Sequence, residues 1–464
     1  MSRWTPDPSF YPSPRLAMDA PQEKYAYVAL VEPSQSSRAD ALGVLDLDSS
    51  SSSFGTVVNT LDTAAPGDEL HHFGWNACSA ALCPSSARPH VERRYLVVPG
   101  LRSSRVYIYD TKPDPLQPQL VKTIEPDELK RKTGYSRPHT THCGPDAIYV
   151  SALGGSNGAD EAGGLFLLDC ESFDPLGAWE VDKGPQRYSY DFWWHLGYDT
   201  LLTSEWGTPS MVENGVVPEK LLGREYGHAM HVWDLRKRRH VKQLDLGDQH
   251  QMVLELRPAH DPRRTYGFVG VVVSVEDLSA SVWLWHRDDG DWAIRKVIEI
   301  PAEPASAEEL PPLLQGFGAV PPLVTDINLS LDDRFLYVSC WGTGALLQYD
   351  VTDPFAPKQT GNVRLGGIAS PGSHPQGGPL TGGPQMVEVS RDGRRVYVSN
   401  ALYTTWDVQF YPAGLEGWIA RLDVPADGGM QLEGDFLVTN FDGRLPHQIR
   451  LEGGDSSSDS YCYP

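Results

Sequence analysis

The chain has 464 residues, of which 39 are Lys or Arg and 61 are Asp or Glu, so its formal net charge at pH 7 is −22. A surface this acidic repels phosphate backbones, and no apolar run reaches the ~18 residues of a membrane span, so we expect neither nucleic-acid binding nor a membrane-spanning segment. The 44 glycines and 38 prolines leave little room for long helices and indicate a turn-rich, mostly β protein.

The N-terminal residues are rich in proline and lack the apolar stretch of a secretory signal. We expect residues 1–23 to form an extended segment and residues 24–464 to form one domain. The cysteines are scattered, without the dense, regular spacing of a disulfide framework, which favours a cytoplasmic location. They are Cys78, Cys83, Cys143, Cys170, Cys340 and Cys462.

An apolar or aromatic run that ends in an aspartate recurs along the chain, as in VYIYD and LLQYD. The aspartates are Asp46, Asp110, Asp169, Asp234, Asp350 and Asp423, and a seventh run around Trp285 keeps the alternation without the acid. Each run is preceded and followed by another strand-like segment. Seven units of several strands therefore fill the chain from about Lys24 to Asn440.

A small antiparallel sheet of this kind cannot bury both of its faces alone. Seven such sheets placed around an axis bury their faces against one another, which predicts an all-β chain folded as a single seven-bladed β-propeller. The alternative is two stacked β-sandwich domains, which the even spacing of the units and the lack of a linker disfavour.

Short polar segments mark connections between the expected strands. SLDDR at residues 330–334 and SRDGRR at residues 390–395 predict hairpin turns. The basic run RKRRH at residues 236–240 lies between two strands and indicates a charged turn rather than a localisation signal. PDELKRK at residues 126–132 predicts a short surface helix, and AEEL at residues 307–310 predicts a helical turn.

The innermost strands of propeller blades line one channel, where ligands from distant parts of the chain meet. Histidine is the candidate ligand, because imidazole suits copper, zinc and iron. His71 and His72 are adjacent and would face opposite sides of a strand, so we expect only one of them to reach the channel. His139 and His142 are three residues apart, a spacing that allows both to reach one ion. Further candidates are His228, His231 and His447.

Glu205, Asp326 and Gln385 interrupt otherwise apolar runs. Buried carboxylates are costly unless they are paired or bind a ligand, so these groups either serve chemistry or pin a loop. Cys78 follows the histidine pair closely and would need a nearby cation or metal to be reactive. The sequence has no glycine-rich phosphate loop, GxSxG or HExxH motif, so nucleotide-dependent and serine-hydrolase functions have no support.

Several long motifs, among them DELHHFGWNAC, HTTHC, TDINLSLDDRFLYVS and GGPQM, resemble those of the selenium-binding protein (SBP56) family, whose members include the methanethiol oxidases. The resemblance runs from about Ser13 to Asp459. It implies a seven-bladed propeller and a copper-dependent oxidation of methanethiol by O2 and water, which yields formaldehyde, hydrogen sulfide and hydrogen peroxide.

The resemblance also implies roles for individual residues. The implied copper ligands are His71, His72, His139, His142, His260 and His447, whereas His228 and His231 rank lower. Cys78 falls on the cysteine that the family links to selenium. The expected catalytic residues are Cys78 and, as proton acceptors if the fold brings either to the channel, Glu205 or Asp326.

The partners that the resemblance implies are a small thiol, O2 and selenium species. Two alternatives stay open. The first is a copper oxidase that acts on another small thiol or organosulfur compound, and the second is a non-catalytic protein that binds selenium or thiols through Cys78.

Overall fold

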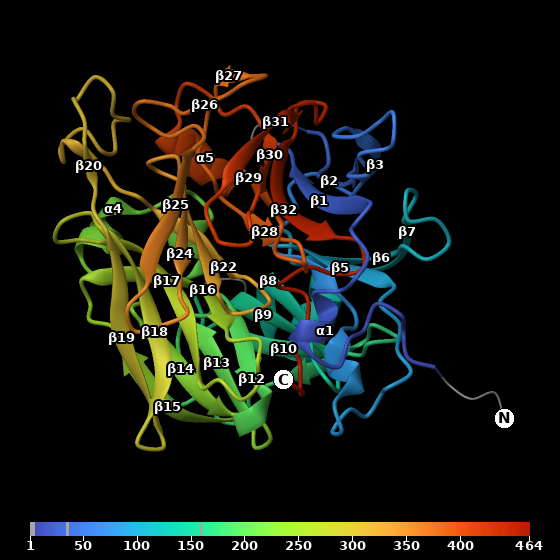
Figure 1. Cartoon of the computed structure of the whole chain (residues 1–464). Helices are drawn as coiled ribbons and strands as arrows, with labels where there is room; N and C mark the ends of the chain where they lie inside the picture. The colour runs from blue at the N-terminus through green and yellow to red at the C-terminus, as the bar shows by residue number, and fades with distance from the viewer. Residues whose placement is uncertain (1–4, 34–36, 158–159) are drawn as a thin grey trace.

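The computed structural model describes residues 5–33, 37–157 and 160–464. Seven four-stranded antiparallel sheets stand around a common axis and form a single seven-bladed β-propeller (Figure 1). The repeat pattern predicted this architecture, and the alternative of two stacked β-sandwiches is wrong.

Each blade is named here from its innermost to its outermost strand. The first three blades are β32 (Leu445–Leu451), β1 (Tyr25–Val31), β2 (Ala41–Asp46) and β3 (Val57–Asp62); β4 (Gly74–Trp75), β5 (Tyr95–Gly100), β6 (Arg105–Asp110) and β7 (Gln119–Ile124); and β8 (Tyr135–Cys143), β9 (Ile148–Gly155), β10 (Gly164–Leu168) and β11 (Pro175–Ala178).

The other four blades follow in chain order. They are β12 (Phe192–His195), β13 (Thr200–Ser204), β14 (Ala229–Asp234) and β15 (Arg239–Asp245); β16 (His250–Pro258), β17 (Tyr266–Ser274), β18 (Ala280–Asp288) and β19 (Asp291–Ile300); β22 (Val324–Leu329), β23 (Phe335–Cys340), β24 (Ala345–Asp350) and β25 (Lys358–Arg364); and β28 (Val387–Val389), β29 (Arg395–Ser399), β30 (Ile419–Asp423) and β31 (Gln431–Val438).

Burial separates the innermost strands from the outermost ones. Every residue of β16 is buried, whereas β15 is mostly exposed or half-buried. The innermost strands also contact one another from blade to blade, as β16 contacts β12 and β22. The repeat pattern had identified the outer three strands of each unit and missed the fourth. The innermost strands, such as β8 (YSRPHTTHC) and β22 (VTDINL), contain polar residues that interrupt an apolar run.

The first blade is built from both ends of the chain. Its innermost strand, β32, pairs antiparallel with β1. Ile449 of β32 packs in one cluster with Val28 of β1 and Leu45 of β2. This pairing closes the ring of blades.

Short helices and two-stranded sheets lie in the connections. They are α1 (Pro14–Ala17), η1 (Ser79–Leu82), α2 (Pro126–Thr133), η2 (Leu196–Tyr198), α3 (Pro209–Val212), α4 (Pro218–Leu222), α5 (Thr404–Phe410), β20 (Glu303–Pro304) with β21 (Ala319–Val320), and β26 (Ser373–His374) with β27 (Gly378–Pro379). Helices α3 to α5 and both small sheets belong to connections at the end where the innermost strands begin, which is the upper end in Figure 1.

Most of the predicted local elements are confirmed. Helix α2 covers residues 126–132, and turns after Ser330 and Ser390 join β22 to β23 and β28 to β29. Residues 235–238 form the charged turn between β14 and β15. Residues 307–310 form a turn rather than the expected helical one.

A disulfide joins Cys83 to Cys462, across a sequence separation of 379 residues. It ties the C-terminal segment to the end of η1, a link that the scattered cysteine spacing had not indicated. Among the residues that the structure describes, no helix is long and apolar enough to cross a membrane.

Ile449→Ala should weaken the closure of the ring. We expect the free energy of unfolding to fall by about 2–5 kcal/mol, because the change removes buried methyl groups and leaves a cavity. Val58→Ala is a control on the exposed outer strand β3, and it should change the free energy of unfolding by less than about 0.5 kcal/mol. Denaturant titration measures both, and equal effects would contradict a special role of β32.

Candidate metal centre

Four histidine rings from three neighbouring blades meet at the end of the propeller where the innermost strands begin. The ring centroid of His71 lies 4.0 Å from that of His447, 4.6 Å from that of His139 and 4.8 Å from that of His72. The centroids of His72 and His139 are 4.5 Å apart. All four side chains are buried, and ligand atoms of His71, His72 and His447 lie within 4.8 Å of one another. We call these four residues the histidine cluster.

His71 and His72 lie in irregular backbone just before β4. The His71 N–H donates to the Pro99 carbonyl at 3.1 Å, and the Thr141 N–H of β8 donates to the His72 carbonyl at 3.1 Å. Gly74 permits this close approach of β8, because a Cβ there would lie 2.3 Å from the Thr141 carbonyl oxygen. Since the segment is not a regular strand, both rings reach the cluster, and the expectation that only one would do so is wrong.

Each ring of the cluster has a buried nitrogen that lacks a hydrogen-bond partner in the described part of the chain. These atoms are Nδ1 of His71 and Nε2 of His72, His139 and His447. Nδ1 of His447 donates to the Ala401 carbonyl at 2.8 Å, so its Nε2 carries a free lone pair. Buried polar atoms are nearly always partnered, so four such nitrogens in one place point to a shared ligand. A metal ion that prefers imidazole fits this donor set.

Burial keeps the imidazoles of the cluster uncharged. It lowers the pKa of His71, His72 and His139 well below the ordinary 6.5, and their histidine neighbours lower it further. It lowers the pKa of His447 to about 4. Because metals bind the neutral form of imidazole, the cluster is ready to bind an ion at neutral pH.

Glu255 of β16 lies next to His72 of the cluster. Its Oε1 lies 3.4 Å from Nδ1 of His72 and accepts a hydrogen bond from the Tyr190 hydroxyl at 2.9 Å. Its Oε2 lies 3.0 Å from Nη1 of Arg257. Burial and the neighbouring Asp191 raise the pKa of Glu255 to about 8. A carboxyl group behind a metal-binding histidine orients its ring, and Glu255 lies where it could position His72 in this way.

The sequence analysis did not select Glu255, although the signal was present. Glu255 interrupts the apolar run VLELRP just as Asp326 interrupts its own run. Neither its partner Tyr190 nor the nearby Trp206, whose ring centroid is 6.2 Å from that of His139, carried a pattern that marks a site.

His142 lies outside the cluster. Its ring packs against Trp193, with 3.8 Å between centroids, and its Nε2 lies 3.4 Å from Oδ1 of Asp191. A register shift between Pro138 and Thr141 interrupts the regular pairing of β8 between the two histidines. His139 and His142 therefore do not come together on one site in this structure.

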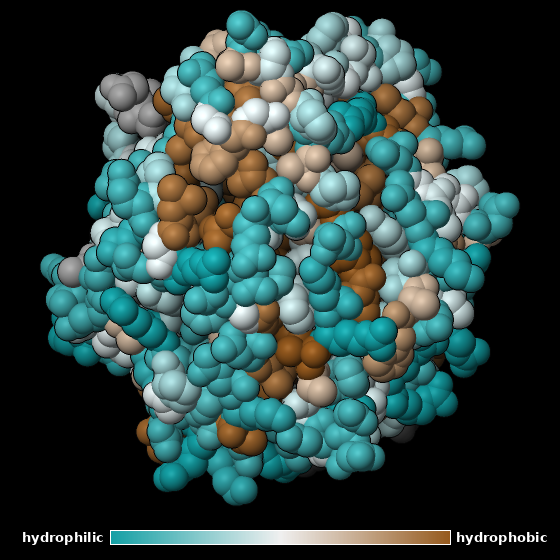
Figure 2. All heavy atoms as spheres, turned by 90° about the vertical axis from the view of Figure 1, so that its left-hand side faces the viewer, coloured by the Kyte–Doolittle hydropathy of each residue, from teal (hydrophilic) through white to brown (hydrophobic). Residues whose placement is uncertain are grey.

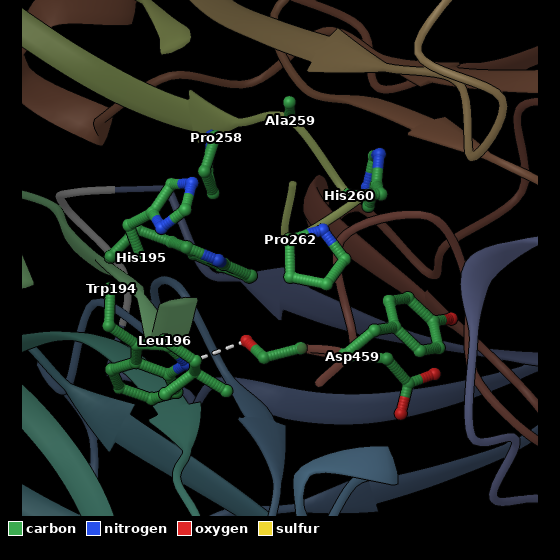
Figure 3. A pocket seen from close by; sticks show the side chains of 11 residues that line it. Trp194, His195, Leu196, Pro258, Ala259, His260, Pro262 and Asp459 are labelled. Atoms are coloured by element: carbon green, nitrogen blue, oxygen red, sulfur yellow. Dashed lines mark hydrogen bonds between the residues drawn. The ribbon is translucent and has the colours of Figure 1, made fainter. Parts of the chain in front are cut away.

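His260 lies in a different pocket, which His195 and the C-terminal Asp459 also line (Figure 3). Its Nε2 donates to the Ser456 carbonyl at 2.9 Å, and its Nδ1 lies 3.0 Å from Oδ1 of Asp333. Both ring nitrogens are thus engaged by protein groups, and the structure does not bring His260 to the cluster.

Glu205 and Asp326 are paired elsewhere. Oε1 of Glu205 lies 2.8 Å from Nε2 of His231. Asp326 accepts a hydrogen bond from the Val387 N–H at 2.7 Å and lies 3.2 Å from Nη2 of Arg257. In the described structure neither carboxylate contacts the cluster, so a role for them in proton transfer stays a prediction.

Cys78 belongs to a separate small cluster with Cys143 and the Cys83–Cys462 disulfide. Its Sγ lies 3.1 Å from the Cys143 carbonyl oxygen, and the side chain is buried. The structure therefore separates the thiol from the four imidazoles, and its catalytic role also stays a prediction.

Known proteins resemble this chain over nearly its whole length. The family model described as 56 kDa selenium-binding protein (SBP56) matches residues 4–462. A protein of Xenopus laevis named methanethiol oxidase is 38% identical over 97% of both chains. Selenium-binding protein 3 of Arabidopsis thaliana is 37% identical over 97% of this chain and 96% of its own. The crystal structure of a hypothetical selenium-binding protein from Sulfolobus tokodaii is 54% identical, has a TM-score of 0.96, and is matched over 99% of this chain and 100% of that one.

The neutral cluster should make the metal-free protein less stable in acid. A histidine whose pKa is lower in the folded state stabilises the fold above its ordinary value of 6.5, and this stability is lost as the pH falls towards the folded value, about 4 for His447. The loss is at most about 1.4 kcal/mol per pH unit for each histidine. Denaturant titrations between pH 7.5 and pH 5 measure it.

A matched pair of variants isolates the contribution of the cluster. His447→Gln removes one of these titrations and should flatten the loss of stability with falling pH. His90→Gln changes an exposed histidine and should keep the wild-type slope. A wild-type slope in the His447 variant would show that the cluster does not control acid stability.

Proposed function

The chain belongs to the 56 kDa selenium-binding protein (SBP56) family, and from this premise we propose that it is a copper-dependent methanethiol oxidase. The proposed reaction converts methanethiol, O2 and water into formaldehyde, hydrogen sulfide and hydrogen peroxide. Relatives named methanethiol oxidase that match nearly the whole chain support the activity.

The histidine cluster is the observation that supports copper. It offers four uncharged imidazoles whose unpartnered nitrogens are buried together. Among the divalent first-row metals, copper binds nitrogen donors most tightly. A buried cluster with imidazole donors therefore favours copper over magnesium, calcium or manganese, which prefer oxygen ligands.

Bound copper would supply the electron exchange with O2 that protein side chains lack. The chain's own residues would hold and shield that centre. His71, His72 and His447, whose ligand atoms lie within 4.8 Å of one another, would provide ring nitrogens, and the ring of His139 lies beside them. Glu255 lies 3.4 Å from Nδ1 of His72 and would help to orient that ring. The rings of Tyr190 and Trp206 cover His139, with centroids 4.2 Å and 6.2 Å from it, and keep bulk water away from the reacting thiol.

A second candidate function is the binding of selenium or thiols at Cys78 without a metal. Cys78 and Cys143 lie next to the buried Arg93, which pairs with Asp459 through Nη2 and whose Nη1 has no hydrogen-bond partner in the described chain. A nearby cation is a common feature of reactive cysteines. Stoichiometric binding that needs Cys78 and no metal would favour this function over the oxidase.

Loss of a cluster histidine should abolish copper binding and turnover together. We expect His139→Ala and His447→Ala each to weaken copper binding by more than about 100-fold, since ligand loss costs at least as much as loss of a supporting residue. Elemental analysis of protein from copper-supplemented cells, with assays of sulfide and peroxide, measures both effects.

His260→Ala is the comparison variant for copper content, because both nitrogens of His260 already bind protein groups. It should bind copper as the wild type does. Full copper content in His447→Ala, or its loss in His260→Ala, would contradict the proposed ligand set.

Glu255→Gln should disturb the copper centre without removing a ligand. The amide places an NH2 group where a carboxyl oxygen now faces a donor, either the Tyr190 hydroxyl or the Arg257 guanidinium, and so displaces the group beside His72. Copper affinity should therefore fall by about 10–100-fold, and the electron paramagnetic resonance spectrum of bound Cu(II) should change. Glu205→Gln is the matched control, since Glu205 pairs with His231 rather than with the cluster. Glu205→Gln should leave the copper affinity and the spectrum unchanged. A change in Glu205→Gln together with no change in Glu255→Gln would reject Glu255 as the residue that positions His72.

A further inference from the structure

An apolar cavity opens on the same end of the propeller as the histidine cluster. It lies among α4, α5, β17 and the segment between β20 and β22, and its volume is about 120 Å³. Leu221, Val273, Leu314, Trp406 and Phe410 are among its walls. Its lining is almost entirely hydrocarbon, which suits an uncharged ligand.

Aromatic rings connect this cavity to the cluster. Trp406, on the cavity wall, packs against Trp206 with 5.5 Å between ring centroids. Trp206 packs against Tyr190 at 5.3 Å, and Tyr190 packs against His139 at 4.2 Å. All three aromatic residues belong to one apolar cluster that also contains Leu314. The cavity wall and the imidazoles are therefore the two ends of a continuous row of packed rings.

One polar atom in this row of rings lacks a hydrogen-bond partner. Nε1 of Trp206 is buried and has no hydrogen-bond partner among the described residues. Indole N–H groups that are buried usually find an acceptor. A small thiol that reached Trp206 from the cavity would offer its sulfur as a weak acceptor.

The outer rim of the cavity is exposed and hydrophobic. Leu222 of α4 is 55% exposed and Phe317 is 48% exposed, and both line the opening. Figure 2, which faces the side that carries α4 and β20, shows hydrophobic atoms at the surface among hydrophilic ones. The cavity is thus open to a ligand from solution.

We propose that this cavity is the binding and entry site for small uncharged thiols on their way to the histidine cluster, an inference that rests on the proposed oxidase function. Its volume of about 120 Å³ is below the roughly 150 Å³ of an apolar cavity that accepts benzene, so it takes short alkanethiols. Cysteine and glutathione carry charges, and moving these into a hydrocarbon-lined cavity costs too much free energy.

Filling the cavity tests the proposal. Leu314→Trp places a bulky ring in the cavity, and Leu176→Trp makes the same change on the exposed strand β11, where Leu176 is 57% exposed. Crystals pressurised with xenon should show the gas in the cavity of the wild type and of Leu176→Trp, and not in Leu314→Trp. Absence of xenon from the wild-type cavity would overturn the proposal.

Kinetics of the copper-loaded proteins test the path to the cluster. Leu314→Trp should raise the KM for methanethiol by about tenfold or more and leave kcat and copper content unchanged, because it alters binding and not the site of reaction. Leu314→Ala enlarges the cavity and should extend turnover to longer alkanethiols. It gives an independent test if Leu314→Trp does not fold. An unchanged KM in Leu314→Trp would overturn the proposal.

A readout without turnover separates this proposal from the proposed function. Ethanethiol should displace xenon from the wild-type cavity, as followed by 129Xe nuclear magnetic resonance, and glutathione should not. Displacement in a protein that oxidises no thiol would support the binding site and reject the oxidase. Failure of ethanethiol to displace xenon would reject the binding site whatever the activity.

Discussion

The pairing of β32 with β1 is the interaction on which both the fold and the candidate site depend. It joins the two ends of the chain in one blade and closes the ring. It also brings His447 to 4.0 Å from His71 between ring centroids, although the two residues are far apart in sequence. The histidine cluster therefore exists only in the closed propeller, which couples the integrity of the fold directly to that of the proposed metal site.

Buried ion pairs fix the innermost strands around this cluster. Arg257 pairs with Asp191, Glu255 and Asp326, which come from three blades. Arg450 lies 2.6 Å from Glu388, and its Nε donates to the Phe73 carbonyl at 3.0 Å, next to His72. An unpaired buried charge is costly, so these networks hold only when every strand is in place. They hold the backbone next to His71 and His72 in place, while the imidazoles themselves stay neutral.

The sequence was sufficient for the blades and for part of the site. Apolar runs that end in an aspartate reveal the outer strands, because the aspartate begins a turn. Asp46, Asp110 and Asp169 each accept a hydrogen bond from the backbone N–H two residues on. The innermost strands escaped notice because polar residues interrupt them, as His139 and His142 do in β8 and Asp326 does in β22. The joint placement of His71 and His72 depends on the close approach of β8 to Gly74, and the Cys83–Cys462 link depends on the path of the C-terminal segment. Local sequence patterns contain neither of these long-range contacts.

The two ends of the propeller differ in a way that bears on the substrate. At one end the C-terminal segment packs over the channel, where the Ser456 carbonyl accepts a hydrogen bond from His260 and Asp459 pairs with Arg93 at 2.6 Å. At the other end the long connections that carry α3, α4 and α5 place apolar side chains over the histidine cluster. A charged molecule would have to shed its hydration to pass this apolar cover, whereas a small neutral thiol or O2 would not. Under the proposed function, the connections that cover the cluster would therefore also select its reactants by charge and size.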